Sequence, residues 1–340
     1  MNKILKKTLQ ILLSFALGGG ILYWMYRNFD FAKMEDVMLH HMRWEWMLLS
    51  FIPGILAQVF RALRWQLALK PIGERCRTHV AVCAIYLSYA ASLVIPRVGE
   101  FLRCGVLKNK DDVSFARSLG AVLTERAVDM IVMLLLCCGV FLFQWQAFCD
   151  FFAKSGVSLS NLTSRFSSTG IMVTAICAVC IVILGLIVMK KMQLLTRVKA
   201  TLQGLIEGVM SLKHVSNIPL YLIYSVGIWA AYFFHYYLTF FCFGFSENLG
   251  LDAALVSFCV GTVAVIVPTP NGAGSWHFAV KSVLLPYMLM LPGAVPQAAA
   301  ENAEQFVLIV HTVQTLLLVI LGIYAIVALQ FTPKRSLREA

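Results

Sequence analysis

The sequence predicts an all-α polytopic integral membrane protein with about six full spans and two re-entrant broken hairpins, arranged as an inverted repeat. Of its 340 residues, 60% are hydrophobic and 13% are charged, and the mean hydropathy is +0.79. An ordinary soluble domain has roughly 45–50% apolar and 25% charged residues. The apolar residues form long runs, the basic residues lie between the runs, and two runs end in proline and glycine. Any chemistry should therefore lie in or beside the bilayer.

The first apolar run follows a basic N-terminus. Lys3, Lys6 and Lys7 precede the run from Thr8 to Tyr26. No small-residue cleavage site follows, so we interpret the run as an uncleaved first span rather than a secretory signal. The lysines place the N-terminus in the cytoplasm.

Nine apolar stretches are present, and a full crossing needs about 20 mostly apolar residues. If all nine crossed, the two termini would lie on opposite sides. The stretches cover residues 8–26, 46–69, 79–96, 118–143, 171–189, 219–243, 251–268, 276–290 and 304–329.

The basic residues after the third stretch argue against a simple crossing there. If 79–96 crossed, the positive charges that follow it would be moved out of the cytoplasm, against the usual bias. A re-entrant hairpin that turns near Pro96 and leaves through 100–108 keeps them inside. These charges are Arg97, Arg103, Lys108, Lys110 and Arg117.

A second break separates 251–268 from 276–290, because the prolines and glycines between them cannot continue a regular helix. As a hairpin entered from outside, this pair lets 304–329 return the C-terminus to the cytoplasm. Within one domain, 1–340, residues 1–143 and 171–330 are then inverted halves, each with a broken hairpin, the pattern that marks a transporter's binding site. Alternatively, the prolines only kink ordinary spans, giving eight spans by simple count.

The first tip combines a helix break with charge. Pro96 breaks the helix, Gly99 allows close backbone approach, and Arg97 and Arg103 can hold phosphate oxygens. Glu100 would orient an arginine or carry a proton.

Charges also occur inside the long spans, where they are costly and normally face the protein interior. Arg61 and Arg64 share one helix face, as do Glu125 and Asp129, while Arg126 is three residues from Asp129. The carboxylates contact substrate directly, relay protons, or form structural ion pairs with Arg61 or Arg97. The whole set has more arginines than acids, and this positive excess predicts an anionic ligand, for which a lipid phosphate is at hand. The set comprises Arg61, Arg64, Arg97, Arg103 and Arg126 against Glu100, Glu125 and Asp129.

The second tip offers backbone groups and then two basic side chains. His277 and Lys281 share one helix face and are candidates for charge pairing or a proton relay. His235 and His311 could join the relay, or could each be hydrogen-bonded to a neighbouring helix. The tip residues are Pro268, Pro270, Asn271, Gly272 and Gly274.

No nucleophile, nucleotide-binding or metal-ligand motif is evident, so we expect no catalytic residue, cofactor or metal. The ten cysteines are scattered, and Cys177 and Cys180 lie in an apolar stretch without acidic or histidine neighbours. We expect packing roles for them and no disulfide framework. The net charge of +11 is spread over loops, which favours anionic lipid over nucleic acid as the partner.

Four ordered motifs resemble the lysylphosphatidylglycerol synthase transmembrane-region family, the flippase-like membrane domain family, over nearly the whole chain. They are Arg61-Ala-Leu-Arg64-Trp65, the Pro-Arg-x-Gly-Glu-x-x-Arg run from Pro96 to Arg103, Glu125-Arg126 with Asp129, and Pro-Thr-Pro-x-Gly-x-Gly from Pro268 to Gly274.

This resemblance implies movement of phospholipids or other lipid-linked anions across the bacterial cytoplasmic membrane. The sequence ends shortly after the last predicted span, so we expect no aminoacyl-transfer domain and do not carry over synthase activity. His277 stands where many relatives have Glu, which leaves an acidic role on the outer side without support. The alternatives are a membrane-embedded enzyme or enzyme subunit in glycolipid or aminoacyl-phospholipid synthesis, and a structural partner in an envelope assembly. A second copy of the chain or an envelope-lipid synthesis protein would be a further partner.

Overall fold

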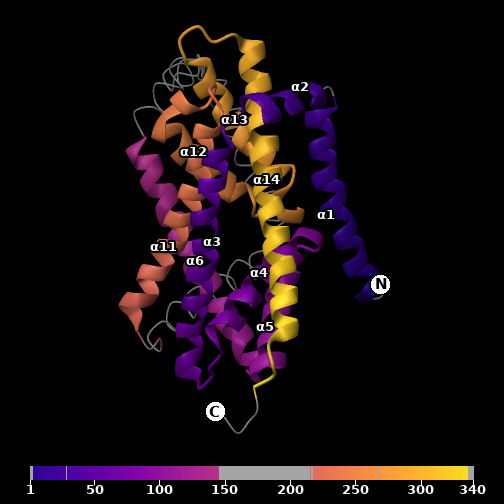
Figure 1. Ribbon diagram of the computed structural model, residues 1–340, viewed down its shortest axis with the longest axis vertical. Coiled ribbons are helices and arrows are strands. Elements are labelled where there is room, and N and C mark those ends of the chain that lie inside the picture. Colours follow the sequence, from indigo (N-terminus) through magenta and orange to yellow (C-terminus); the bar gives the residue numbers. More distant parts are fainter. Residues whose placement is uncertain (1–2, 28, 145–214, 216, 268, 336–340) are drawn as a thin grey trace, which may run out of the picture.

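The computed structural model describes residues 3–27, 29–144, 215, 217–267 and 269–335, and the regular secondary structure of this part of the chain is helical, without a strand (Figure 1). The N-terminal helices are α1 (Lys3–Tyr26), α2 (Phe31–Asp36), η1 (Val37–His41), α3 (Trp44–Leu69), η2 (Lys70–Ile72), α4 (Thr78–Val94), α5 (Val98–Asp111) and α6 (Phe115–Phe143). The C-terminal helices are α11 (Ile218–Tyr237), η4 (Leu238–Cys242), η5 (Glu247–Leu249), α12 (Gly250–Ala264), η6 (Pro270–Gly272), α13 (Ser275–Leu289) and α14 (Pro296–Phe331).

The protein is a multi-pass membrane protein. In the described residues, five helical segments are long and apolar enough to cross a membrane: Trp44–Ile72, Phe115–Phe143, Ile218–Cys242, Glu247–Ala264 and Pro296–Phe331. Three of them contain the spans predicted over 46–69, 118–143 and 304–329, Ile218–Cys242 covers all but the last residue of the span predicted over 219–243, and α1 contains the one predicted over 8–26. The predicted span 171–189, with Cys177 and Cys180, lies outside the described residues. Glu247–Ala264 is long enough to cross by its length alone, although the sequence placed it in a hairpin.

The first broken hairpin consists of α4 and α5, with 17 and 14 residues, which is fewer than the roughly 20 needed for a crossing. The helix stops before Pro96, and Arg97 takes a left-handed conformation with φ of 66°. At the other end of the hairpin, the Arg77 side chain before α4 donates to Asp111 at the end of α5 over 2.7 Å. The chain therefore enters and leaves this hairpin at one end, as a re-entrant path requires.

Gly99 sets the distance between the two arms of this hairpin. A Cβ atom at position 99 would lie 1.9 Å from the backbone oxygen of Ser88 on α4. Only glycine allows such an approach, so the close contact predicted for Gly99 is confirmed.

The second broken hairpin consists of α12, η6 and α13. Asn271, Gly272 and Gly274 all have positive φ, at 50°, 71° and 84°, a conformation that favours glycine and tolerates asparagine. Gly261 on α12 lies against Trp276 on α13, so the two arms pack side by side. Pro270 begins η6, and Pro268 lies outside the described residues.

The two hairpins approach each other from opposite ends of the molecule. In Figure 1, α4 and α5 occupy the lower half and α12 and α13 the upper half, and α14 runs past both. The end of α4 contacts η6 of the opposite hairpin, so the two tips meet inside the bundle. Trp65 and Phe306 are each buried in the centre of one of two hydrophobic cores, one around each hairpin. The division into inverted halves at 1–143 and 171–330 stays a prediction.

Candidate functional site

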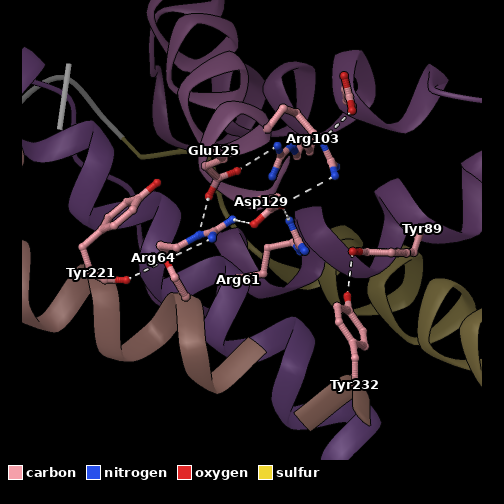
Figure 2. A network of polar contacts seen from close by, with 11 residues as sticks. Arg61, Arg64, Tyr89, Arg103, Glu125, Asp129, Tyr221 and Tyr232 are labelled. Atoms are coloured by element: carbon pink, nitrogen blue, oxygen red, sulfur yellow. Dashed lines mark hydrogen bonds and ion pairs between the residues drawn. The ribbon is translucent and has the colours of Figure 1, made fainter. Parts of the chain in front are cut away.

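Three arginines and two carboxylates form a buried network between α3, α5 and α6 (Figure 2). The Asp129 carboxylate accepts from Arg61 at 2.6 Å and pairs with the Arg64 guanidinium at 2.7 Å. Glu125, one turn earlier on α6, pairs with Arg103 at 2.9 Å and lies 3.7 Å from Arg64 Nε. Glu125 and Asp129 share a helix face, which is why one helix can hold arginines from two others.

Aromatic rings and a hydroxyl complete the surroundings of these arginines. The guanidinium of Arg103 lies 4.6 Å from the ring centre of Trp65, and that of Arg64 lies 5.5 Å from the ring of Tyr221. Arg64 also donates to Ser225 Oγ on α11 at 3.1 Å. Hydrogen bonds, ion pairs and ring faces compensate part of the loss of water around buried charge, while Nε and Nη1 of Arg103 have no hydrogen-bond partner among the described residues. The predicted ion pair of Asp129 with Arg61 is therefore confirmed, whereas Arg97 is not part of the network.

Arg126 extends the network towards open space. Its Nε pairs with Glu100 of α5 at 2.8 Å, and its Nη1 lies 3.8 Å from Asp129, while the side chain stays 43% exposed. Glu100 thus pairs with Arg126 and not with Arg97 or Arg103, and its role in orienting an arginine or carrying a proton stays a prediction. Arg97, one turn before Glu100, is exposed at the hairpin tip and makes no ion pair with the described residues.

A cavity of about 390 Å³ lies where the two hairpins meet. Tyr89 of α4 and Arg126 of α6 contribute from the first half of the chain, and Asn271 of η6 and Trp276 of α13 from the second. A substrate site at the meeting of two broken elements is the arrangement expected of a transporter. The cavity is thus the candidate functional site, with Arg126 as the link between it and the buried network.

Neutral polar side chains supply most of the remaining polarity of the cavity wall. The hydroxyls of Tyr89 and Tyr232 are 2.7 Å apart (Figure 2). Gln314 on α14 donates to the backbone oxygen of His235 at 3.0 Å. Tyr89 and Tyr232 gave no signal in the sequence, because tyrosine is common in membrane helices, whereas Gln314 could have been noticed as an amide inside an apolar run.

The two histidines of the cavity wall each bond to a neighbouring element. His235 Nδ1 lies 2.7 Å from the backbone oxygen of Ser50 on α3, and His311 Nε2 lies 3.1 Å from that of Asn271 on η6. A carbonyl oxygen only accepts, so each of these nitrogens carries the proton and donates. The interhelical hydrogen bonds predicted as the alternative to a relay are therefore present.

His277 and Lys281 share a face of α13 but bind different partners. His277 is buried, its Nδ1 accepts from the backbone N–H of Gly274 at 3.3 Å, and its ring centre is 4.4 Å from that of His311. Lys281 forms an ion pair with Glu304 on α14. His277 thus closes the hairpin tip, and Lys281 ties α13 to α14.

A larger hollow, of about 580 Å³, lies at the base of the first hairpin. Lys108, Lys334 and Arg335 make it basic, and Asp112 is its one carboxylate among the described lining residues. Basic residues at this position are expected wherever the end of a membrane helix faces anionic lipid. The hollow lies away from the tips, so we place the functional site at the central cavity.

A family model described as "Lysylphosphatidylglycerol synthase TM region" matches residues 11–322. The matched range includes both broken hairpins, the arginine network and the cavity. No curated protein and no solved structure matched the chain.

Proposed function

Because the chain belongs to the lysylphosphatidylglycerol synthase transmembrane-region family, whose name places it in membrane lipid metabolism or transport, we propose that it moves a phospholipid or another anionic lipid-linked substrate across the bacterial cytoplasmic membrane. Both termini then lie in the cytoplasm, as the basic residues at both ends favour. The single observation that carries the proposal is Arg126, a half-exposed cation fixed by Glu100 and Asp129 at the wall of a cavity between two broken hairpins.

The division of roles among the arginines follows from their partners. Arg126 has guanidinium surface left for a phosphate oxygen, and Arg97 at the exposed tip makes the first contact with the headgroup. Arg61, Arg64 and Arg103 already bind carboxylates. In this proposal they hold α3, α5 and α6 in register and add positive potential, and direct contact of Arg61 or Arg103 with a phosphate stays a prediction.

The hairpins act as alternate gates around the bound headgroup. With α4–α5 and α12–α13 approaching from opposite ends, displacement of one tip opens the cavity to one side while the other tip closes it. The acyl tails stay in the bilayer, so only the polar headgroup crosses through protein. The phosphate therefore loses its water only at the cavity, where an arginine replaces part of its hydration.

The experiment is transport in vesicles that contain the purified chain. Fluorescent acyl-labelled phosphatidylglycerol is placed in both leaflets of phosphatidylcholine vesicles, and dithionite added outside destroys only the outer label, with and without an imposed pH gradient. We expect the protein to expose label beyond the outer half. Arg126→Gln should slow this about tenfold or more, since a charge-assisted hydrogen bond contributes about 1.5–3 kcal/mol.

Arg117→Gln is the matched control, because Arg117 is 61% exposed, pairs with Glu74 and does not line the cavity. Equal rates for the Arg126→Gln and parent proteins would overturn the assignment of Arg126. If the purified chain moves no lipid, and Arg97→Gln and Glu100→Gln leave its function in cells intact at equal protein level, a structural role in an envelope assembly replaces transport. Chemically altered lipid in the vesicle extract without any movement would instead favour a synthesis enzyme.

A further inference from the structure

The chemistry of the cavity wall indicates which groups, attached to the lipid phosphate, the cavity can bind. Of the described residues that line the cavity, Arg126 alone carries a formal charge. The rest of the wall combines aromatic rings with neutral hydrogen-bonding groups. The rings include Trp229, Tyr232 and Trp276, and the neutral groups include Gln58, Asn271 and Gln314.

Two of these wall residues have polar atoms without a protein partner. Gln58 is 2% exposed, and its amide oxygen makes no hydrogen bond with the described residues. The indole N–H of Trp229 is also buried and without an acceptor there. An unmet buried polar group costs about 1–3 kcal/mol, and both side chains line the cavity, so a ligand towards which they turn to form hydrogen bonds gains part of that free energy. The amide oxygen of Gln58 is an acceptor, and the indole N–H of Trp229 is a donor.

A hydroxyl group satisfies both kinds of atom, whereas an ammonium group satisfies only one. A hydroxyl donates and accepts, but an ammonium group only donates, so it cannot accept from Trp229. Arg126 would also repel an ammonium group, and the nearby carboxylates that could offset this repulsion, Glu100 and Asp129, are paired with arginines. Flat aromatic walls beside amide groups suit a polyol or a sugar ring, which has an apolar face and hydroxyl edges.

We infer that the cavity is selective for a lipid whose phosphate carries an uncharged, hydroxyl-rich headgroup, a polyol or a sugar, and that it disfavours a headgroup with an added ammonium group. The inference rests on the proposed function, because it assumes that the cavity receives a lipid headgroup. The volume of about 390 Å³ is within the ~300–1,000 Å³ of ligand pockets.

The test is competition for binding with defined lipids. The chain is held in phosphatidylcholine nanodiscs with acyl-labelled phosphatidylglycerol as the bound probe. The competitors are phosphatidylinositol, phosphatidylglycerol, lysyl-phosphatidylglycerol and phosphatidic acid, which share the phosphate and differ beyond it. We expect phosphatidylinositol to compete at least tenfold better than phosphatidic acid, and phosphatidylglycerol at least tenfold better than its lysyl ester.

Two variants assign the selectivity to the cavity wall. Gln58→Leu and Trp229→Phe should each weaken phosphatidylinositol binding about tenfold while leaving phosphatidic acid binding unchanged. Neither polar atom has a partner in the described protein, so the fold should tolerate both changes. Trp46→Phe is the control, because Trp46 packs on Phe241 and does not line the cavity.

The outcomes separate the two proposals. If phosphatidic acid competes as well as phosphatidylinositol, or the lysyl ester as well as phosphatidylglycerol, the headgroup inference is overturned while lipid phosphate binding stands. If the labelled phosphatidylglycerol does not bind, or if no anionic lipid displaces it, the proposed function itself fails. Equal losses for phosphatidic acid and phosphatidylinositol in Gln58→Leu would show that Gln58 supports structure and not headgroup selection.

Discussion

Asp129 is the residue on which the buried network depends most. Its carboxylate is paired with both Arg61 and Arg64, which are 4% and 0% exposed at their side chains. Replacing one partner of a buried ion pair leaves the opposite charge uncompensated, which typically costs about 3–5 kcal/mol. In the proposed function, network stability and lipid contact are therefore properties of different residues, Asp129 for the first and Arg126 for the second.

We therefore expect Asp129→Asn to lower the free energy of unfolding by about 3–5 kcal/mol, measured by denaturant titration in mixed detergent micelles. Asp36→Asn is the control, since that side chain is 57% exposed and pairs only with exposed histidines, and it should change the value by no more than about 0.5 kcal/mol. A small effect at Asp129, similar to that at Asp36, would mean that the buried arginines do not need their counter-ion.

The charged residues of the network could be nominated from the sequence because charge is rare in apolar segments. Their pairing could not be predicted in full. Which carboxylate meets Arg103, and whether Arg126 or Arg61 faces open space, depends on how each helix is rotated about its axis, which is set by packing between distant segments. The neutral wall of the cavity was harder still, because Tyr89 and Tyr232 have the same apolar body as residues that only pack.

At the scale of elements, the close packing of α4 against α5 requires that residue 99 is a glycine, which has no side chain. Gly99→Ala would place a methyl group 1.9 Å from Ser88 O, so the arms must separate. We expect a loss of about 1–3 kcal/mol in unfolding free energy, as for other overpacked sites, together with reduced lipid movement in the vesicle assay.

Gly105→Ala on the same helix is the matched control. A Cβ atom there meets nothing within 4 Å, and alanine is the better helix former, so this change should raise the unfolding free energy by about 0.5–1 kcal/mol. A loss of stability in both variants would show that α5 is sensitive at any position, and that the close approach at Gly99 is not the cause.

The breaks themselves were predictable, because proline and glycine act locally on the backbone. Pro96 and Gly99 mark the first tip, and Gly272 and Gly274 mark the second, as the structure shows. The status of the arm Glu247–Ala264 was less predictable, since its length suits a crossing whereas its packing against α13 makes it one side of a hairpin. Hydropathy reports composition, and only tertiary contacts show where a helix turns back.

For the whole molecule, the inverted design makes a prediction about sidedness. In intact cells, a membrane-impermeant thiol reagent should label Asn248→Cys and Val295→Cys, whereas Asn109→Cys should react only after permeabilisation. All three positions are exposed in the structure, so failure to react reports sidedness and not burial. The ten native cysteines are first replaced, and equal membrane levels of each variant are the control.

Labelling of Asn109→Cys from outside would mean that α4 crosses the membrane and that the first hairpin is not re-entrant. The basic residues near the base of that hairpin would then lie outside, against the charge bias that predicts the topology. Labelling at Asn248 and Val295 only after permeabilisation would mean that the whole bundle has the opposite orientation in the membrane.

The ion pair between Arg61 and Asp129 joins residues 68 positions apart, and this separation imposes an order on how the protein is made. During synthesis α3 reaches the bilayer with two arginines before α6 exists to neutralise them, and arginine in a spanning helix is costly to insert. We therefore expect α3 to be retained beside the insertion channel until Glu125 and Asp129 emerge, so that the two helices enter the lipid together and the network assembles during insertion.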